Sequence, residues 1–279
     1  MSMERVLIVT GGGSGIGAAV ARLASARGDH VVICGRRKEA LERVTAETGA
    51  EARVVDVTVP EAVAGLVDGV VASYGRLDGV VANAGVIRGG GVLDVSLEDW
   101  EDSLRTNLTS VFLLAKAALP HLIAAGADAG AREGARAGGA GALVAVSSIA
   151  ALRAASGTTA YGTAKAGLNM LVQTIAADYG PRGIRANVVC PGWVRTEMAD
   201  GEMREFGEPL GLTEDEAYEE MTRLVPQRRP AAPEEAAAAI LWLLGPEASY
   251  VNGAVLNVDG GTTLLDPGTI PYDFKINPR

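Results

Sequence analysis

Seven short, continuously apolar runs alternate along the chain with longer stretches in which apolar residues recur every three or four positions. The short runs have the length and composition of strands buried on both faces of a sheet, and the longer stretches have the period of amphipathic helices. The predicted strands are residues 5–9, 30–34, 52–55, 77–82, 143–147, 184–190 and 254–258. The predicted helices are residues 18–27, 38–48, 60–74, 160–179 and 233–244, together with a long helix that follows Ser96 and ends near residue 125.

This alternation predicts an α/β fold. Strands that alternate with helices form a parallel sheet with helices on both faces, and seven strands fit a doubly wound Rossmann fold. No linker or internal repeat divides the 279 residues, so we expect a single domain over residues 1–279. Ligands bind such folds at the carboxyl ends of the strands. Five motifs are predicted to lie there, at residues 11–17, Asp56, Asn83, Ser148 and Pro191.

Three segments depart from the regular pattern. Residues 126–141 are nearly all Gly, Ala, Arg, Asp and Glu without an apolar period, which predicts a flexible surface insertion. Residues 196–229 are polar with scattered apolar positions, which predicts a mobile lid over the substrate. A C-terminal tail, residues 262–279, follows the last predicted strand.

A glycine-rich turn joins the first predicted strand to the first predicted helix. Its glycines allow the backbone to approach a pyrophosphate, and the helix N-terminus offers unpaired N–H groups. A tight turn without a function is the alternative interpretation. Strand, turn and helix together predict a phosphate cradle that includes Gly11, Gly13, Ser14, Gly15, Ile16 and Gly17.

Tyr161 and Lys165 stand four residues apart in a predicted helix, so their side chains project from the same face. A free tyrosine titrates near pH ~10, and a nearby cation lowers that pKa. The pair is therefore a candidate general acid/base. Ser148 lies at the end of the preceding strand, and Asn107 is polar among apolar neighbours, where a backbone hydrogen bond would also account for it.

The glycine turn, Asn107, Ser148 and the Tyr161–Lys165 pair resemble, in this order, the short-chain dehydrogenase/reductase family in its short single-domain branch. The resemblance runs from about Arg5 to Gly261 and implies reversible hydride transfer between a nicotinamide coenzyme and a ketone or secondary alcohol. It implies that Tyr161 is the general acid/base and that Ser148 hydrogen-bonds the substrate oxygen. It also implies that Lys165 lowers the Tyr161 pKa and holds the nicotinamide ribose, and that Asn107 holds a water that passes protons to the lysine.

The resemblance also implies where the coenzyme binds. Asp56, which is followed by Val57, matches an acidic position that contacts the adenine ring. The family's Asn-Ala-Gly segment beside the cofactor is matched by Asn83, Ala84 and Gly85. The nicotinamide-binding turn is matched by Pro191, Gly192, Val194 and Thr196, with Thr196 near the carboxamide.

The end of the second strand bears on the choice of coenzyme. An acidic residue there would bind the adenosine ribose hydroxyls, but this chain has Gly35 followed by Arg36 and Arg37. The NADP-preferring members of the family resemble this chain in having an arginine there, and a guanidinium can hold a phosphate with two parallel hydrogen bonds. Ser14 stands where many of those members have a second basic residue. We expect NADP(H) to be preferred and NAD(H) to be possible; a solvated charge pair is the alternative.

Composition excludes several other classes of partner. The net charge of −9 argues against nucleic acid or an anionic membrane. No apolar run approaches the ~18 residues of a membrane span, since residues 108–125 are interrupted by Lys116 and Pro120. No signal peptide is recognisable, and Cys34 and Cys190 are predicted to be buried thiols in a reducing compartment, so we expect a cytoplasmic protein. With two cysteines and two histidines, no metal site is predicted.

Other functions and substrates were weighed against this interpretation. A serine hydrolase would need Gly-x-Ser-x-Gly, but Ser14 has Ile16 two residues after it. An extended-family epimerase or dehydratase would have a larger C-terminal domain, and an idle cofactor-binding regulatory protein would be expected to lack Ser148, Tyr161 or Lys165. A 3-oxoacyl thioester reductase remains an alternative. The acidic chain and apolar lid favour a neutral or apolar carbonyl compound.

The family resemblance also implies assembly. Its members form dimers, and dimers of dimers, through the two long helices that here contain Asn107 and Tyr161. We therefore expect a homotetramer. The apolar contact is predicted to come from Val111, Leu114, Ala118, Leu168, Leu171 and Ile175.

Overall fold

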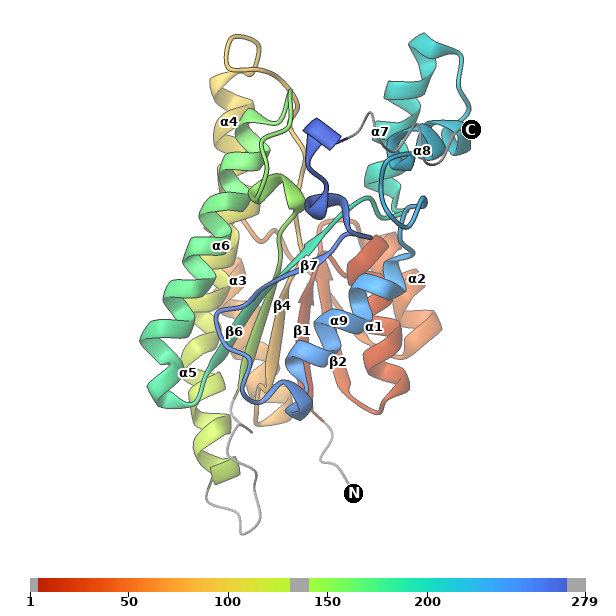
Figure 1. Ribbon diagram of the computed structural model, residues 1–279. Helices are drawn as coiled ribbons and strands as arrows, with labels where there is room; N and C mark the ends of the chain where they lie inside the picture. Colours follow the sequence, from red (N-terminus) through yellow and green to blue (C-terminus); the bar gives the residue numbers. More distant parts are fainter. Residues whose placement is uncertain (1–4, 131–140, 270–279) are drawn as a thin grey trace.

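The computed structural model describes residues 5–130 and 141–269, and its centre is a seven-stranded parallel sheet (Figure 1). The strand order is β3-β2-β1-β4-β5-β6-β7, so the chain starts in the middle of the sheet and builds outward in both directions. The strands are β1 Val6–Thr10, β2 His30–Gly35, β3 Glu51–Val54, β4 Gly79–Ala82, β5 Ala142–Val146, β6 Arg185–Pro191 and β7 Val255–Val258. This is the doubly wound fold that the sequence predicted, with strand ends displaced by at most two residues.

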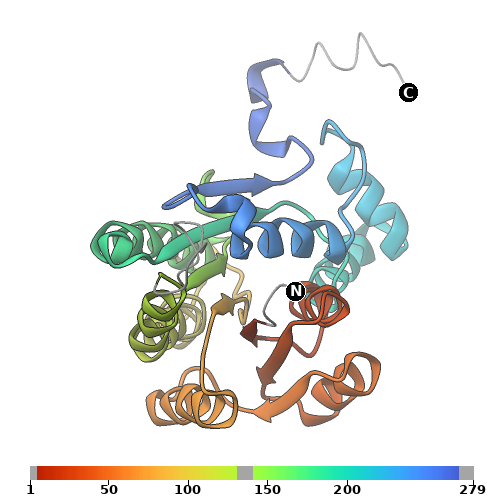
Figure 2. The same ribbon diagram turned by 90° about the horizontal axis from the view of Figure 1, so that it is seen from below.

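Two layers of helices cover the sheet, one on each face (Figure 2). The first layer contains α3 Pro60–Tyr74, α5 Ser110–Gly130 and α6 Thr159–Tyr179, and the second contains α1 Gly15–Ala26, α2 Lys38–Thr48 and α9 Pro233–Leu244. The central strands are buried on both faces, which is why they read as uninterrupted apolar runs. Helix α1 begins three residues before its predicted start, because Gly15 and Gly17 belong to its first turn.

The helix predicted to start after Ser96 consists of three parts. The Ser96 hydroxyl caps α4, Leu97–Leu104, by accepting a hydrogen bond from the Asp99 N–H. A π-helical turn, Arg105–Thr109, then leads into α5, so that the buried Asn107 lies in the π turn. Helix α5 continues to Gly130, so the first five residues of the predicted insertion at 126–141 are helical, which corrects that prediction. Residues 131–140 of the insertion lie outside the described residues.

By length and composition, one stretch of the described residues, Leu97–Ala125, could cross a membrane, with a mean hydropathy of 1.6. Its apolar residues Val111, Leu114, Ala118 and Leu122 belong to the core cluster on this face of the sheet. These are the contacts of a helix that covers a sheet.

The same burial corrects the predicted assembly surface. Val111, Leu114, Ala118, Leu168 and Ile175 are all less than 10% exposed and belong to the core, so they cannot form an exposed interface. Leu171, the sixth predicted contact residue, is partly exposed, and the large apolar residues that these two helices expose within the described part are Phe112 and Met170. The prediction was wrong because helical periodicity locates an apolar stripe without showing which of its members the sheet already covers.

The predicted lid is a pair of folded helices, α7 Glu197–Gly207 and α8 Glu214–Thr222. They pack on each other through Ala199, Met203, Ala217 and Tyr218. Backbone hydrogen bonds join the two ends of the segment, because the Ala231 N–H donates to the Trp193 carbonyl and the Arg195 N–H donates to the Ala231 carbonyl. The predicted mobility of this lid stays a prediction.

Candidate active site

A cleft of about 700 Å³ lies at the carboxyl ends of the strands. Its wall is formed by the ends of β1, β2, β4, β5 and β6 and by the first turn of α7. Each predicted site residue lines this cleft except Gly17, which is buried behind the wall. Sequence positions as distant as Gly11 and Thr196 are therefore brought into one site.

The glycine turn has the geometry of a phosphate cradle. Gly11 has a φ of +65°, a left-handed conformation that side chains disfavour. A Cβ on Gly17 would lie 2.3 Å from the Gly11 carbonyl oxygen, so the turn can close only with glycine there. The N-cap residue Ser14 makes no side-chain cap hydrogen bond, which leaves first-turn N–H groups of α1 available to an anion. These residues fit the pyrophosphate of a dinucleotide.

Thr10 and Asn83 fasten this turn to the end of β4. The Asn83 side-chain amide donates to the carbonyls of Thr10 (3.0 Å) and Gly11 (3.2 Å). The Thr10 hydroxyl accepts from the backbone N–H groups of Asn83 (3.0 Å) and Ala84 (3.1 Å). The sequence interpretation missed Thr10, although its place directly before the first glycine marks it as part of the same turn.

Asn107 bonds to the loop after β4. Its side-chain amide donates to the Val86 carbonyl (2.9 Å) and to the Ser103 carbonyl (3.0 Å), and its side-chain oxygen accepts from the Val86 N–H (3.1 Å). The backbone-bonding interpretation of this side chain is therefore correct. Gly85 lets these groups come together, since a Cβ there would lie 2.9 Å from the Asn107 side-chain oxygen and 3.6 Å from the Lys165 ammonium.

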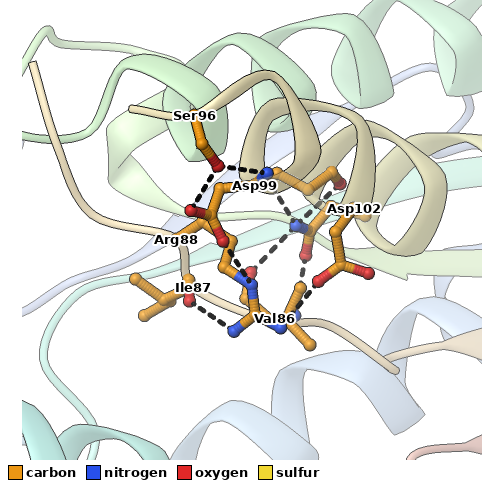
Figure 3. Close-up of polar contacts among 8 residues, drawn as sticks. Val86, Ile87, Arg88, Ser96, Asp99 and Asp102 are labelled. Atoms are coloured by element: carbon orange, nitrogen blue, oxygen red, sulfur yellow. Dashed lines mark hydrogen bonds and ion pairs between the residues drawn. The ribbon is translucent and has the colours of Figure 1, made fainter. Parts of the chain in front are cut away.

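A second set of polar contacts holds the same loop from outside (Figure 3). Arg88 pairs with Asp102 at 2.7 Å and with Asp99 at 3.5 Å, both on α4, and also donates to the Ile87 carbonyl. The Ser96 hydroxyl donates to the Asp99 carboxylate at 2.7 Å. The loop from 86 to 88 is thus fixed to α4 on one side and to the π turn on the other.

Ser148, Tyr161 and Lys165 meet at the centre of the cleft. The Tyr161 phenol lies near the Ser148 side chain, which acts to lower the pKa of that phenol. The Lys165 ammonium lies 5.7 Å from the centre of the Tyr161 ring and donates to the Val146 carbonyl at 2.8 Å. The end of β5 therefore contributes the Ser148 hydroxyl, and one face of α6 contributes the Tyr161 phenol and the Lys165 ammonium.

Burial dominates the ionisation of this group. It raises the pKa of Tyr161 to about 12, against the lowering effect of the Ser148 side chain and with the negative charge of Glu202 also raising it. Burial lowers the pKa of Lys165 to about 8. Burial therefore outweighs the other influences on the Tyr161 pKa, and the predicted lowering of that pKa by Lys165 stays a prediction.

The two arginines after β2 differ in their contacts. Arg37 bridges two parts of the cleft wall, pairing with Glu197 of α7 at 2.7 Å and donating to the Ser14 hydroxyl at 3.0 Å. The hydrogen bond from Arg37 lowers the pKa of Glu197. Arg36 is exposed and makes no hydrogen bond or ion pair within the described part of the chain. Nearby, the Asp56 carboxylate accepts from the Thr58 N–H at 2.9 Å.

The turn after β6 leads the chain from the sheet into α7. The Gly192 N–H donates to the Val258 carbonyl at 3.1 Å, and the Thr196 hydroxyl caps α7 by accepting from the Ala199 N–H at 3.2 Å. Further residues that the sequence interpretation missed also line this end of the cleft. They come from the lid, the tail and the loop before α6, and no local motif marks them: Arg153, Met198, Glu202, Thr262 and Thr263.

Comparisons with known proteins agree with this geometry. Residues 11–263 match a family model described as enoyl-(acyl carrier protein) reductase. The chain is 40% identical to Protein MoaE of Klebsiella aerogenes, over 97% of this chain and 100% of that one. It is 34% identical to meso-2,3-butanediol dehydrogenase of Serratia marcescens, over 94% of this chain and 96% of that one.

Solved structures of known proteins are also similar to this chain over most of its length. Levodione reductase superposes with a TM-score of 0.85 at 30% identity, covering 94% of this chain and 98% of that one. A variant of actinorhodin polyketide ketoreductase with NADPH superposes with a TM-score of 0.84 at 31% identity, covering 92% and 97%.

The chain belongs to the short-chain dehydrogenase/reductase family. It is a nicotinamide-dependent oxidoreductase that transfers a hydride between its coenzyme and the carbon of a small-molecule ketone or secondary alcohol.

Proposed function

We propose that Tyr161 is the general acid/base of this reaction, with Ser148 and Lys165 as its partners and Asn107 as a residue of the proton path. The observation behind the proposal is that the polar groups of Tyr161, Ser148 and Lys165 converge in one cleft next to the glycine cradle. The cradle, Asp56, Val57, the residues from Asn83 to Gly85 and the turn from Pro191 to Thr196 would hold the dinucleotide, whose nicotinamide supplies or takes the hydride when it is bound.

In the direction of reduction, the Tyr161 phenol gives its proton to the substrate oxygen. Its raised pKa keeps the phenol protonated at neutral pH, as a proton donor needs to be. Ser148 donates a hydrogen bond to the same oxygen as negative charge develops there. Lys165 is held beneath Tyr161 by the Val146 carbonyl, so its ammonium stabilises the phenolate that remains. Asn107 holds the loop beside Lys165 in place.

The substitution Tyr161→Phe tests this assignment. It removes only the hydroxyl, so the fold and coenzyme affinity should persist, while turnover should fall by roughly 10²- to 10⁴-fold, the usual contribution of acid–base catalysis. The measurement is absorbance of the reduced nicotinamide with a panel of ketones and alcohols. Tyr179→Phe, at the far end of the same helix, is the matched control. Near-native turnover by the Tyr161 variant would refute the assignment.

We also propose a preference for NADP(H), with NAD(H) possible. Gly35 presents no carboxylate to the adenosine ribose, and Arg36 lines the cleft without a hydrogen bond or ion pair in the described residues, although its charge lowers the pKa of Asp56. A guanidinium that is free in this position can hold a 2′-phosphate in two parallel hydrogen bonds. The neighbour with NADPH supports this choice.

The substitution Arg36→Ala tests the coenzyme proposal. Hydrogen bonds between charged groups are worth about 1.5–3 kcal/mol, so kcat/KM with NADPH should fall very roughly ten- to a hundredfold while kcat/KM with NADH changes little. Arg27→Ala, an arginine at the opposite end of α1, serves as the control. A native enzyme that is faster with NADH would contradict the preference.

A 3-oxoacyl thioester reductase is the second candidate. It is favoured by 33% identity to 3-oxoacyl-[acyl-carrier-protein] reductase of Chlamydia muridarum, over 93% of this chain and 97% of that one. Including an acetoacetyl thioester in the substrate panel distinguishes this candidate from an enzyme for simple ketones. Faster reduction of the thioester than of simple ketones would favour the 3-oxoacyl thioester reductase.

We further propose a cytoplasmic homotetramer formed from a single-domain chain, residues 1–279. The family's usual interface helices, α5 and the catalytic helix α6, expose Phe112 and Met170 to solvent. Residues 196–229 act in this proposal as the lid and residues 262–279 as the tail.

A further inference from the structure

Charged side chains are unevenly distributed along the cleft. Within the described part of the chain, seven of them line it, and four lie at the adenosine end, near the ends of β2 and β3: Arg36, Arg37, Asp56 and Glu197. Lys165 lies beneath Tyr161, where it donates to a backbone carbonyl. The remaining two, Arg153 and Glu202, lie on the segments that enclose the other end, where the proposed mechanism places the substrate.

Arg153 is already bound to the protein. Its guanidinium donates to the carbonyl of Leu265 at 2.6 Å and to the carbonyl of Thr263. These bonds fasten the C-terminal segment beside the cleft and occupy two of the five N–H donors of the guanidinium. Because both acceptors are neutral carbonyls, the positive charge of Arg153 remains at this end of the cleft.

Glu202 has no such partner. It lies one helical turn after Met198 on α7, and both side chains line the cleft. The Glu202 carboxylate forms no hydrogen bond or ion pair with any residue that the structure describes. It is partly buried, and burial and the charge of Glu205 raise its pKa. Its negative charge also acts on Tyr161, so the carboxylate lies within electrostatic reach of the reacting group.

The Glu202 carboxylate is partly desolvated and has no hydrogen-bond or ion-pair partner among the described residues, so a ligand group can partner it. A hydroxyl would donate one hydrogen bond without cancelling the charge, whereas an ammonium would donate a hydrogen bond and also cancel the charge. The overall charge of −9 and the adjacent Glu205 add to the negative potential, which favours a cation and disfavours an anion.

We propose that Glu202 binds a positively charged amino group of the substrate, and that the enzyme therefore acts on amino alcohols and the corresponding amino ketones. This inference rests on the proposed function, because it assumes that the substrate oxygen lies at Tyr161. Glu202 takes no part in the redox step. In oxidation, the carbinol C–H bond breaks with its electron pair going to the nicotinamide, the hydroxyl proton passes to Tyr161 in its phenolate form as the C=O bond forms, and the amino group is unchanged.

The kinetic test uses alcohols that differ in one group. 1-Amino-2-propanol, 2-butanol and 1,2-propanediol form one series, and 2-amino-1-phenylethanol, 1-phenyl-1-propanol and 1-phenyl-1,2-ethanediol form the other. In at least one series, kcat/KM for the amine should exceed that for the alkyl and diol compounds by about tenfold or more, as expected for a hydrogen-bonded charge pair. A native enzyme that prefers the alkyl or diol compound in both series would overturn the proposal.

Two variants locate the source of this preference. Glu202→Gln keeps the side-chain shape and removes the charge, so the amine-to-alkyl ratio of kcat/KM should fall toward one. Glu205→Gln removes the same charge from the same helix, but Glu205 is exposed and does not line the cleft, so the ratio should persist. A ratio that survives Glu202→Gln, or that falls equally in both variants, would show that Glu202 is not the binding group.

A binding measurement separates this proposal from the proposed function. Calorimetric titration of the same alcohols into protein saturated with NADPH needs no turnover, because the reduced coenzyme cannot accept a hydride. The amines should bind about tenfold more tightly than their alkyl analogues, and Glu202→Gln should abolish the difference. Selective amine binding without oxidation would refute the proposed function alone, whereas alcohol oxidation without selective amine binding would refute this inference alone.

Discussion

Lys165 is a residue whose charge the fold disfavours. Burial lowers its pKa from 10.5 to about 8, so between these two values the unfolded chain binds a proton that the folded protein does not. The free energy of unfolding should therefore rise as the pH increases from about 8 to about 10.5. Below pH 8 the folded protein holds a buried ammonium at a cost in stability.

The measurement is denaturant unfolding of the native protein and of Lys165→Met across pH 7 to 10. The methionine variant should lose the rise in stability over that window, because it has no proton to release. Lys116→Met, at an exposed position of α5, should keep the rise. Identical slopes for all three proteins would show that Lys165 titrates normally.

Residue identities at the site could be predicted from the sequence, but their electrostatics could not. Helical spacing alone places Tyr161 and Lys165 on one face, and the end of a strand exposes Ser148. Ionisation depends on how deeply distant segments bury these groups, which no local pattern contains. The same holds for Arg37, whose partners Ser14 and Glu197 are 23 and 160 residues away in the sequence.

At the scale of elements, the Arg37–Glu197 pair joins the adenosine end of the cleft to the first turn of α7. A coenzyme 2′-phosphate that uses Arg37 would have to compete with Glu197 for it. Both side chains are more than half exposed, and exposed pairs are worth about 0.2–1 kcal/mol. We predict that Glu197→Gln tightens NADPH binding about two- to fivefold and leaves NADH binding unchanged.

Fluorescence titration of each coenzyme measures this effect. The control is Glu42→Gln, which breaks the exposed Lys38–Glu42 pair on α2 without altering a cleft residue. Equal changes for NADPH and NADH would mean that Glu197 acts on the whole site rather than on the phosphate.

Most elements could be predicted because their apolar periods are strong: α2, α3 and α9 begin and end where the pattern placed them. The helices of the lid were harder to predict from the sequence, because α7 and α8 are mostly polar and bury few residues. A signal was nevertheless present in Thr213 and Glu216, which form a capping box at the start of α8. The π turn at Asn107 leaves no such signal, because its sequence continues the helical pattern.

At the scale of the whole molecule, the proposed tetramer needs apolar side chains that are exposed on the surface of one subunit and are not already buried in its core. Phe112 of α5 and Met170 of α6 are 47% and 64% exposed, and they supply it. We predict that Phe112→Asp combined with Met170→Glu shifts the protein from tetramer to smaller species, since buried interface charges are strongly unfavourable. Light scattering at micromolar concentration measures the mass. A native protein that is already monomeric would contradict the proposed assembly.

Backbone hydrogen bonds between Trp193, Arg195 and Ala231 join the two ends of the lid segment. Arg185 strengthens the frame below it by donating to the carbonyls of Leu243, Gly245 and Ala248, which links β6 to the end of α9. The bonds that join the two ends of the lid segment use backbone atoms alone, so they place no requirement on the side chains of the helices enclosed between them. Helices of different length and composition can therefore be enclosed by the same frame, which lets the substrate end of the cleft vary while the hydride-transfer residues are kept.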